Sequence, residues 1–119
     1  MNMTDEDKNL LIRDTSGRID TNTFVKVVYA YPSSRNESFN QFIHASDLEN
    51  IKIGVYKEYK PYLRQLCDMT DEEKKQYDKL EKPHEKMDFI NLNHFDPRGL
   101  IDKGLAIQAD KNTYKQHSN

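Results

Sequence analysis

The chain has 119 residues, of which 35% are hydrophobic and 32% are charged, and its formal net charge is −2. This length predicts a single domain, and the low hydrophobic content predicts a small core. The slight negative charge argues against general binding to nucleic acid or to anionic lipid. No apolar run approaches the ~18 residues of a membrane helix, and the acidic N-terminus lacks the apolar segment of a signal peptide. A single cysteine, Cys67, cannot form an internal disulfide, so the composition indicates a soluble, cytoplasmic protein.

The N-terminal segment is predicted to form a short helix from about Asp5 to Thr15. Thr4 is a suitable N-cap, acidic residues fill the first turn, and Gly17 follows where the helix can end. A hairpin that turns through residues 14–17 is the alternative.

The middle of the chain is predicted to form a three-stranded antiparallel meander. The best strand, Thr23 to Tyr31, is apolar on both faces, which is typical of a central strand that a helix covers on one side. Ser38 to Ala45 is a second strand. A third is indicated by an alternating apolar pattern at Ile51, Ile53 and Val55. The connections are short enough for antiparallel hairpins.

Two helices are predicted after a tyrosine-rich extended segment that runs from Tyr56 to Leu66. Pro61 excludes a regular helix in that segment and restricts any strand there to a sheet edge. Thr70 and Glu73 form the pattern of a capping box, which starts a surface helix that Pro83 closes. A further helix from about His84 to His94 is expected to bury a broad face, made of Met87, Phe89, Ile90, Leu92 and Phe95.

The stretch HFDPRGLIDKGLAI, residues 94–107, concentrates helix-boundary signals. Asp96 suits an N-cap, Pro97 the first helical position and Gly104 a left-handed C-terminal residue, so we predict a two-turn helix from Pro97 to Lys103. A type I turn at residues 96–99 is the alternative. The apolar residues 105–107 then re-enter the core as an extended segment.

Together these elements predict an α+β fold, with a small antiparallel sheet of about three to four strands and short helices packed on one face. Residues 1–109 are expected to form a single domain, and the polar residues 110–119 a flexible tail.

Several short motifs in the C-terminal half carry a resemblance. They are KPYLR at 60–64, MTDEEK at 69–74, HFD at 94–96, RGLI at 98–101 and GLA at 104–106. In these motifs the chain resembles a group of small uncharacterised proteins of Bacteroides-type gut bacteria, their prophages and their phages. The resemblance implies an origin in a bacterial or phage genome, on a mobile element. It implies no activity and no catalytic residue.

The most suggestive candidate site is the alternation of aromatic and basic side chains in residues 56–64. Tyrosines that stack on bases, beside cations that meet phosphate, are the ingredients of a nucleotide or single-strand site. The candidate ligand-binding residues are Tyr59, Lys60, Tyr62 and Arg64, together with Arg98 near a predicted helix start. We favour by about four to one the plainer interpretation, in which the tyrosines cover the sheet edge and the lysines remain solvated. For Arg98, an ion pair with Asp96 or Asp102 is favoured.

Metal binding and thiol chemistry are not supported by the sequence. His84 and His94 are ten residues apart, and Asp96 is better used as an N-cap. His94 is expected to pack at a helix end and to hydrogen-bond to backbone. Cys67 follows Leu66 and is expected to be a small buried residue and not a nucleophile.

The sequence therefore favours a non-enzymatic binding or accessory protein, because it has no glycine-rich phosphate loop, no metal-ligand spacing and no nucleophile motif. We expect it to act by protein–protein interaction, with a host or phage protein as partner and with no cofactor, metal or membrane. Binding of a small ligand such as a nucleotide, or of nucleic acid, through residues 56–64 is the alternative. An enzyme ranks third and would need a deep pocket with convergent polar groups. The sequence indicates neither the identity of the partner nor the oligomeric state.

Overall fold

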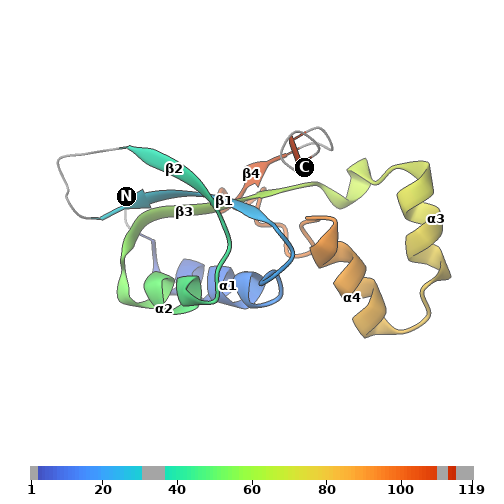
Figure 1. The fold of residues 1–119 in the computed structure, drawn as a ribbon, viewed down its shortest axis with the longest axis horizontal. Coiled ribbons are helices and arrows are strands. Elements are labelled where there is room, and N and C mark those ends of the chain that lie inside the picture. The colour runs from blue at the N-terminus through green and yellow to red at the C-terminus, as the bar shows by residue number, and fades with distance from the viewer. Residues whose placement is uncertain (1–2, 31–36, 110–112, 115–119) are drawn as a thin grey trace.

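A computed structural model describes residues 3–30, 37–109 and 113–114 of the chain (Figure 1). The described residues form four α-helices, namely α1 (Asp5–Ser16), α2 (Ser46–Ile53), α3 (Asp71–Lys79) and α4 (Pro83–Leu92), and a short 3-10 turn at Leu66–Asp68. They also form four strands, β1 (Phe24–Tyr29), β2 (Ser38–Phe42), β3 (Tyr56–Leu63) and β4 (Ile107–Gln108), in the spatial order β2-β1-β3-β4. Within the described ranges no helix is long and apolar enough to cross a membrane.

The architecture is α+β, as the sequence predicts. β1 lies inside the sheet and pairs antiparallel with β2 and with β3, whereas β4 pairs parallel with β3, so the sheet is mixed and not purely antiparallel. Helices α1 and α2 lie side by side against one face (Figure 1). The core fills the space between them and the sheet, and its fully buried aliphatic residues are Leu11, Val25, Val27, Ile51, Leu63 and Leu100.

The predicted N-terminal helix is confirmed, and the alternative hairpin is not present. The Thr4 hydroxyl accepts the Asp7 N–H at 3.1 Å, and the Asp7 carboxylate accepts the Thr4 N–H in return. This capping box satisfies amides that have no partner inside the helix. Leu11, Asp14 and Thr15 form the buried face of α1.

The predicted third strand of the meander is wrong, because residues 46–53 form helix α2 instead. The Asp47 carboxylate accepts the His44 N–H at 2.9 Å and stabilises the helix start. Gly54 adopts a left-handed conformation with φ of 81° and ends the helix. Ile51 is therefore fully buried and Ile53 is 62% exposed. In a strand, these two residues would have shared one face. The third strand of the sheet is β3.

Pro61 lies within β3, which is an inner strand between β1 and β4. The Ala109 N–H donates to the Leu63 carbonyl at 2.7 Å, so Leu63 faces β4. Pro61 faces the same side because backbone groups alternate along a strand. Pairing with β4 begins only at Tyr62, so the missing N–H of Pro61 breaks no ladder hydrogen bond. The predicted restriction to an edge strand is therefore wrong for β3 as a whole, and the proline is tolerated because β4 does not pair at its position.

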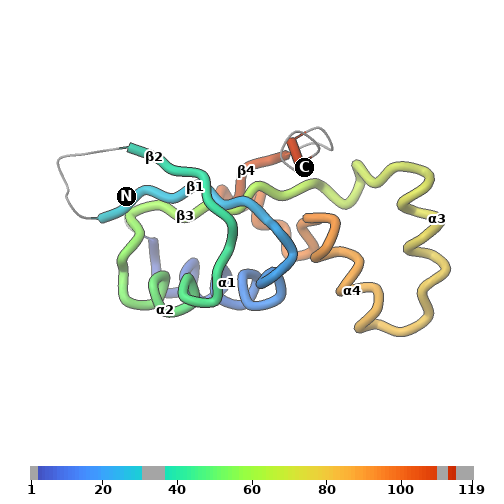
Figure 2. The backbone as a smooth tube through the Cα atoms, viewed as in Figure 1, coloured from blue at the N-terminus to red at the C-terminus, as the bar shows by residue number. Residues whose placement is uncertain are grey.

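Helices α3 and α4 form an arm beside the sheet, and the molecule extends to 49 × 28 × 24 Å. Figure 2 shows the chain leaving the sheet after β3, running through α3 and α4, and returning towards the sheet. The capping box at Thr70 and Glu73 is confirmed. The helix that it starts ends at Lys79, and Pro83 is the first residue of α4, so Pro83 opens the second helix.

The predicted broad buried face of α4 forms only in part, and Phe95, which is fully buried, lies after the helix ends at Leu92. Ile90 is 6% exposed, but Met87 and Leu92 are 39% and 59% exposed. The physical reason is the position of α4, which lies beside the sheet and not under it (Figure 1). Phe89 contacts Tyr77 of α3, with ring centroids 5.9 Å apart, so the two helices of the arm pack on each other.

The predicted helix from Pro97 to Lys103 is also wrong, and successive turns replace it. Gly99 has φ of 69°, which interrupts a helix. The Asp96 carboxylate accepts the N–H groups of Leu100 and Ile101, each at 2.9 Å, and not those of the first turn. The alternative turn at residues 96–99 agrees with the structure. Gly104 is left-handed, as predicted, with φ of 74°.

Candidate functional site

β2 is the outermost strand of the sheet, and its outer edge is the principal candidate site. It pairs with β1 through five consecutive residues, from Ser38 opposite Val28 to Phe42 opposite Phe24. On its other side no strand of the described residues pairs with it. Every residue of β2 except Gln41 is exposed.

The backbone of β2 offers hydrogen-bonding groups on this outer edge. The Ile43 N–H donates to the Thr23 carbonyl at 3.0 Å, so Ile43 faces β1. Backbone groups alternate along an antiparallel strand, so Phe39 and Gln41 face β1 as well. The N–H and C=O groups of Ser38, Asn40 and Phe42 therefore point outward. They form a short row on which a further strand could pair.

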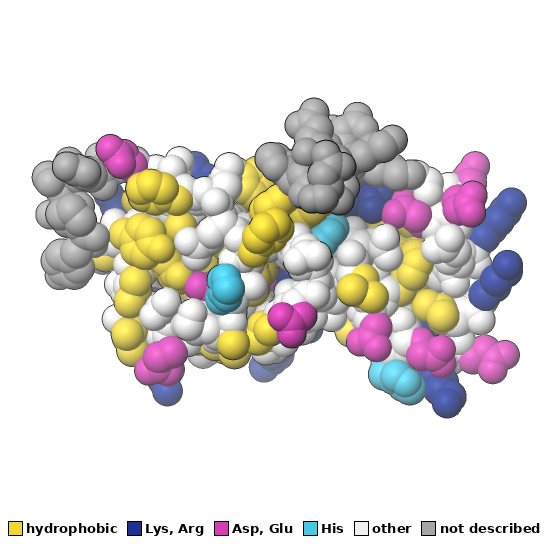
Figure 3. Space-filling model, viewed as in Figure 1, with side chains coloured by type: hydrophobic (Ala, Val, Ile, Leu, Met, Phe, Trp, Pro, Cys, Tyr) yellow, Lys and Arg dark blue, Asp and Glu magenta, His cyan; other side chains and the backbone are white. Residues whose placement is uncertain are grey.

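Two aromatic rings flank that edge, one on each face of the sheet. Phe39 is 48% exposed and contacts Tyr29, with ring centroids 6.0 Å apart. Phe42 is 43% exposed and stacks on Phe24 at 4.6 Å, on the face opposite α1 and α2. Figure 3 shows hydrophobic side chains gathered over the end of the molecule where β2 lies. An added strand would cover apolar surface on both of its faces.

β2 lacks the features that usually protect an edge strand. Its sequence, SFNQF, has no charged residue and no proline. Its pairing with β1 has no register shift, whereas the pairing of β1 with β3 shifts between Val28 and Tyr29. An exposed, neutral and regular edge is the form that accepts another strand.

A hydrogen-bond network that runs from the exposed Tyr29 to the buried Asp47 connects β2 to β3 and α2. Gln41 accepts the Tyr29 hydroxyl and donates to the Tyr56 hydroxyl, each at 3.4 Å. Tyr56 in turn donates to the Asp47 carboxylate at 2.5 Å, and Asp47 is 1% exposed. Burial, and secondly the hydrogen bond to Asp47, raise the pKa of Tyr56 to about 12. Tyr56 therefore keeps its proton at neutral pH, and the network is fixed.

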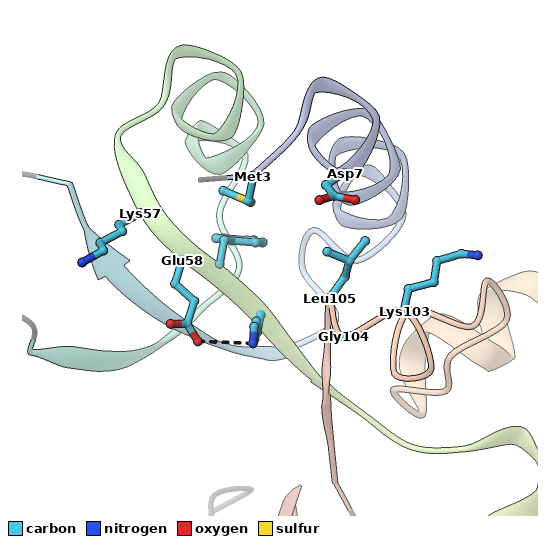
Figure 4. Close-up of a pocket in the computed structure, with 9 residues that line it drawn as sticks. Met3, Asp7, Lys57, Glu58, Lys103, Gly104 and Leu105 are labelled. Carbon is cyan, nitrogen blue, oxygen red and sulfur yellow. Dashed lines mark ion pairs between the residues drawn. The ribbon is translucent and has the colours of Figure 1, made fainter. Parts of the chain in front are cut away.

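A pocket of about 340 Å³ lies between the start of α1, β3 and the turn at residues 103–105. Its lining includes three lysines, Lys57, Lys60 and Lys103, and two carboxylates, Asp7 and Glu58. Lys57 and Lys103 lie at opposite ends of it, and the dashed line marks the ion pair between Glu58 and Lys60, which is 3.6 Å long (Figure 4). The positive charges of the three lysines are nearly balanced by the two carboxylates, so the pocket is not expected to bind anions strongly.

The ligand-binding residues that the sequence predicts do not meet in one groove. Tyr59 and Lys60 both line this pocket. Tyr59 is 1% exposed, and its hydroxyl lies 3.5 Å from both Asp47 and Thr15 in the core. Burial raises the pKa of Tyr59 above its ordinary value. Tyr62 points to the opposite face of the sheet, where its hydroxyl donates to Asn40 at 2.9 Å.

Both predicted arginines are engaged in ion pairs. Arg64 is 5% exposed and donates two hydrogen bonds of 2.8 Å to Glu73, while its guanidinium lies 4.3 Å from the centre of the Phe95 ring. Arg98 binds Asp14 at 3.1 Å. The expected ion pair of Arg98 is therefore present, but its partner comes from α1 and not from Asp96 or Asp102.

The remaining chemical candidates take structural positions. Among the described residues no group of three or more His, Cys, Asp or Glu could hold a metal ion. Cys67 is exposed, which corrects the prediction of a buried thiol. It lies in the 3-10 turn through which the chain passes from the sheet to α3. Its neighbour Leu66 is exposed too, with an exposed fraction of 41%.

His94 and Tyr114 pack against each other beside β1 and β3. Their rings stack with centroids 3.6 Å apart, and His94 Nδ1 lies 2.9 Å from the Thr23 hydroxyl, a side-chain partner and not the expected backbone one. The Tyr114 hydroxyl accepts the Phe24 N–H and donates to the Tyr62 carbonyl, so it bridges β1 and β3. Tyr114 falls within the predicted tail, of which residues 110–112 and 115–119 lie outside the described residues.

The buried position of His94 predicts a pH-dependent stability. Burial, and secondly the charges of Arg18 and Arg64, lower the pKa of His94 from 6.5 to about 4. The unfolded chain therefore binds a proton at a higher pH than the folded one, and stability falls as the pH drops below the unfolded value. We expect a loss of about 1.5 kcal/mol between about pH 6.5 and 5, where carboxylates remain largely ionised.

Urea unfolding at these two pH values tests this expectation. His94→Gln removes the titrating group and should flatten the dependence, whereas His84→Gln, at an exposed position of α4, should preserve it. Equal slopes for the wild type and His94→Gln would show that His94 titrates normally in the folded protein.

Comparisons of this chain with protein-family models, with curated proteins and with solved structures give no match.

Proposed function

We propose that this chain is a non-enzymatic accessory protein of a bacterial or phage mobile element, which binds another polypeptide by adding a strand to the β2 edge. The observation that carries the proposal is the unprotected outer edge of β2 with an exposed phenylalanine on each face, Phe39 and Phe42. In strand addition, main-chain hydrogen bonds supply affinity and alternate side chains supply specificity. β2 offers both, on a strand that the sheet and the Gln41 network already hold in place.

The alternative, binding of a nucleotide or nucleic acid through residues 56–64, has weaker support. Such a site needs stacking rings and cations that face one ligand. Tyr59 and Tyr62 lie on opposite faces of the sheet, and Arg64 is neutralised by Glu73. The pocket beside Lys60 contains two carboxylates as well as its lysines.

Selection of short random peptides from a displayed library tests the proposed edge site. We expect the selected peptides to alternate apolar and polar residues, and to slow hydrogen–deuterium exchange of the outward amides of β2. Asn40→Pro should weaken their binding about tenfold or more, because it removes an outward N–H and leaves the ladder to β1 intact. It also removes the hydrogen bond from Tyr62, so urea unfolding of the variant has to show that the fold is kept.

The control is Leu92→Lys, which changes an exposed hydrophobic residue on α4, far from β2 in the fold. It should bind the selected peptides as the wild type does. Peptides that bind Asn40→Pro with unchanged affinity, or that protect α4 instead of β2, would contradict the proposal.

A further inference from the structure

We infer that the polypeptide bound at the β2 edge is a second copy of this chain, which pairs antiparallel with β2 about a two-fold axis. The inference rests on the proposed use of that edge and names its partner. The two sheets would then join into one continuous sheet. A two-fold interface uses the same patch on both subunits, so the patch has to be complementary to itself.

The backbone of β2 meets this requirement. In an antiparallel pair, residues directly opposite share a face. A two-fold axis at Asn40 pairs all five residues, with Asn40 opposite Asn40 of the partner subunit and Phe42 opposite Ser38 of the partner subunit. In this register the outward-facing groups of Ser38, Asn40 and Phe42 meet the same outward-facing groups of the partner. Each of these three pairs can exchange two hydrogen bonds.

The charges of β2 also match a second copy. No charged side chain lies in residues 38–42, so no like charges meet across the new ladder. Along the chain, the nearest described charge is on Glu37, just before the strand. Across the sheet, Lys26 lies opposite Asn40 and forms an ion pair with Glu58. The two Glu37 carboxylates of the dimer would be six residues apart along the ladder, about 20 Å, at which distance their repulsion is screened. A partner strand with a strong charge would find no complementary charge on β2.

The exposed hydrophobic side chains are arranged for the same pairing. Three of the seven large hydrophobic residues that are exposed in the described chain are Tyr29, Phe39 and Phe42. In the five-residue register, Phe39 lies diagonal to Phe39 of the partner subunit, and diagonal residues are about 7–8 Å apart, within reach of aromatic rings. Both copies would bury the ring that each leaves exposed alone. Because the paired strands are short, we expect a small interface and a dissociation constant in the micromolar range.

Sedimentation velocity over a series of concentrations spanning the micromolar range tests this inference on the full chain. The wild type should convert from monomer to dimer as its concentration rises, and exchange of the β2 amides should slow in parallel. Asn40→Pro and Phe39→Lys should each weaken the dimer about tenfold or more. Leu92→Lys should dimerise as the wild type does. Circular dichroism and urea unfolding identify any variant that has lost the fold.

A wild type that remains monomeric at every concentration, or a dimer that persists in both β2 variants, would overturn the inference. The same experiments can contradict the inferred dimer and the proposed peptide binding independently of each other. If the wild type is monomeric while selected peptides still bind β2 and are lost in Asn40→Pro, strand addition stands and the partner is a different protein. If the dimer forms through β2 but no peptide binds, the edge is a self-association site alone.

Discussion

Replacement of Asp14 by Ala is expected to lower the free energy of unfolding by about 3–5 kcal/mol. Asp14 is fully buried and accepts two hydrogen bonds from Arg18, at 2.8 and 3.1 Å, and one from Arg98 at 3.1 Å. Arg18 is itself fully buried, and its remaining bond goes to the Phe95 carbonyl at 2.5 Å. Without Asp14, a guanidinium would remain in the core without a counter-charge. That penalty exceeds the loss of the hydrogen bonds alone.

Urea unfolding at neutral pH measures this effect, and two variants calibrate it. Arg98→Ala removes a side chain that is 26% exposed, so its loss should be nearer to 1 kcal/mol. Asp78→Ala changes an exposed carboxylate on α3 and should leave stability nearly unchanged. If Asp14→Ala lost no more than Arg98→Ala, the buried pair with Arg18 would be unimportant for stability.

Short sequence signals correctly predicted the starts of α1 and α3 and the central position of β1. The predicted N-cap at Thr4 and the predicted capping box at Thr70 both form, since each needs only side-chain and backbone groups three residues apart. The central position of β1 followed from its two apolar faces, which a sheet interior requires. These signals are contained within a few residues, but the equally local signals at Asp96, Pro97 and Gly104 did not produce a helix, so locality alone does not guarantee the outcome.

The errors arose where a short pattern satisfies two structures. The alternation of Ile51 and Ile53 fits a strand, but an eight-residue helix ending at Gly54 also accommodates it. The choice is made by Asp47, whose carboxylate binds Tyr56 and Tyr59 from a strand that follows later in the chain. A similar ambiguity affected residues 97–103, where the left-handed Gly99 prevents the helix.

The candidate site was only partly accessible from sequence. The period of two in β3 already separates Tyr59 from Tyr62, so an extended segment argued against a single groove of tyrosines. That Arg64 pairs with Glu73 could not be known, because the contact depends on how the arm folds back. A strand from Ser38 to Ala45 was predicted, and the observed strand ends earlier, at Phe42. Its place at the edge follows from topology. The neutral sequence SFNQF was the available signal, and it becomes informative only once the edge is known.

Glu73→Ala is expected to cost about 3 kcal/mol and to release α3 from the rest of the molecule. The side chains of Arg64 and Glu73 are 6% and 12% exposed and share two hydrogen bonds of 2.8 Å. The Glu73 carboxylate also accepts the Thr70 N–H at 2.9 Å in the capping box. α3 has no buried residue, so this pair is a main attachment of the helix to the sheet. Hydrogen exchange should accelerate in α3 and remain slow in β1.

The same carboxylate gives the arm a defined acid sensitivity. The hydrogen bonds from Arg64 are the main cause that lowers the pKa of Glu73 from 4.5 to about 2. The folded form therefore loses its proton more readily than the unfolded chain, so the stabilisation is complete above the unfolded value and is lost as the pH falls from about 4.5 towards 2. The protection factors of the α3 amides, which compare the measured exchange rate with the intrinsic rate at each pH, should fall over this range in the wild type. In Glu73→Gln they should be low already at neutral pH and change little on acidification. Glu72→Ala, at the exposed neighbouring position, should behave as the wild type does. An α3 that remains protected in Glu73→Ala would show that contacts of α4, such as Tyr77 with Phe89, hold the arm instead.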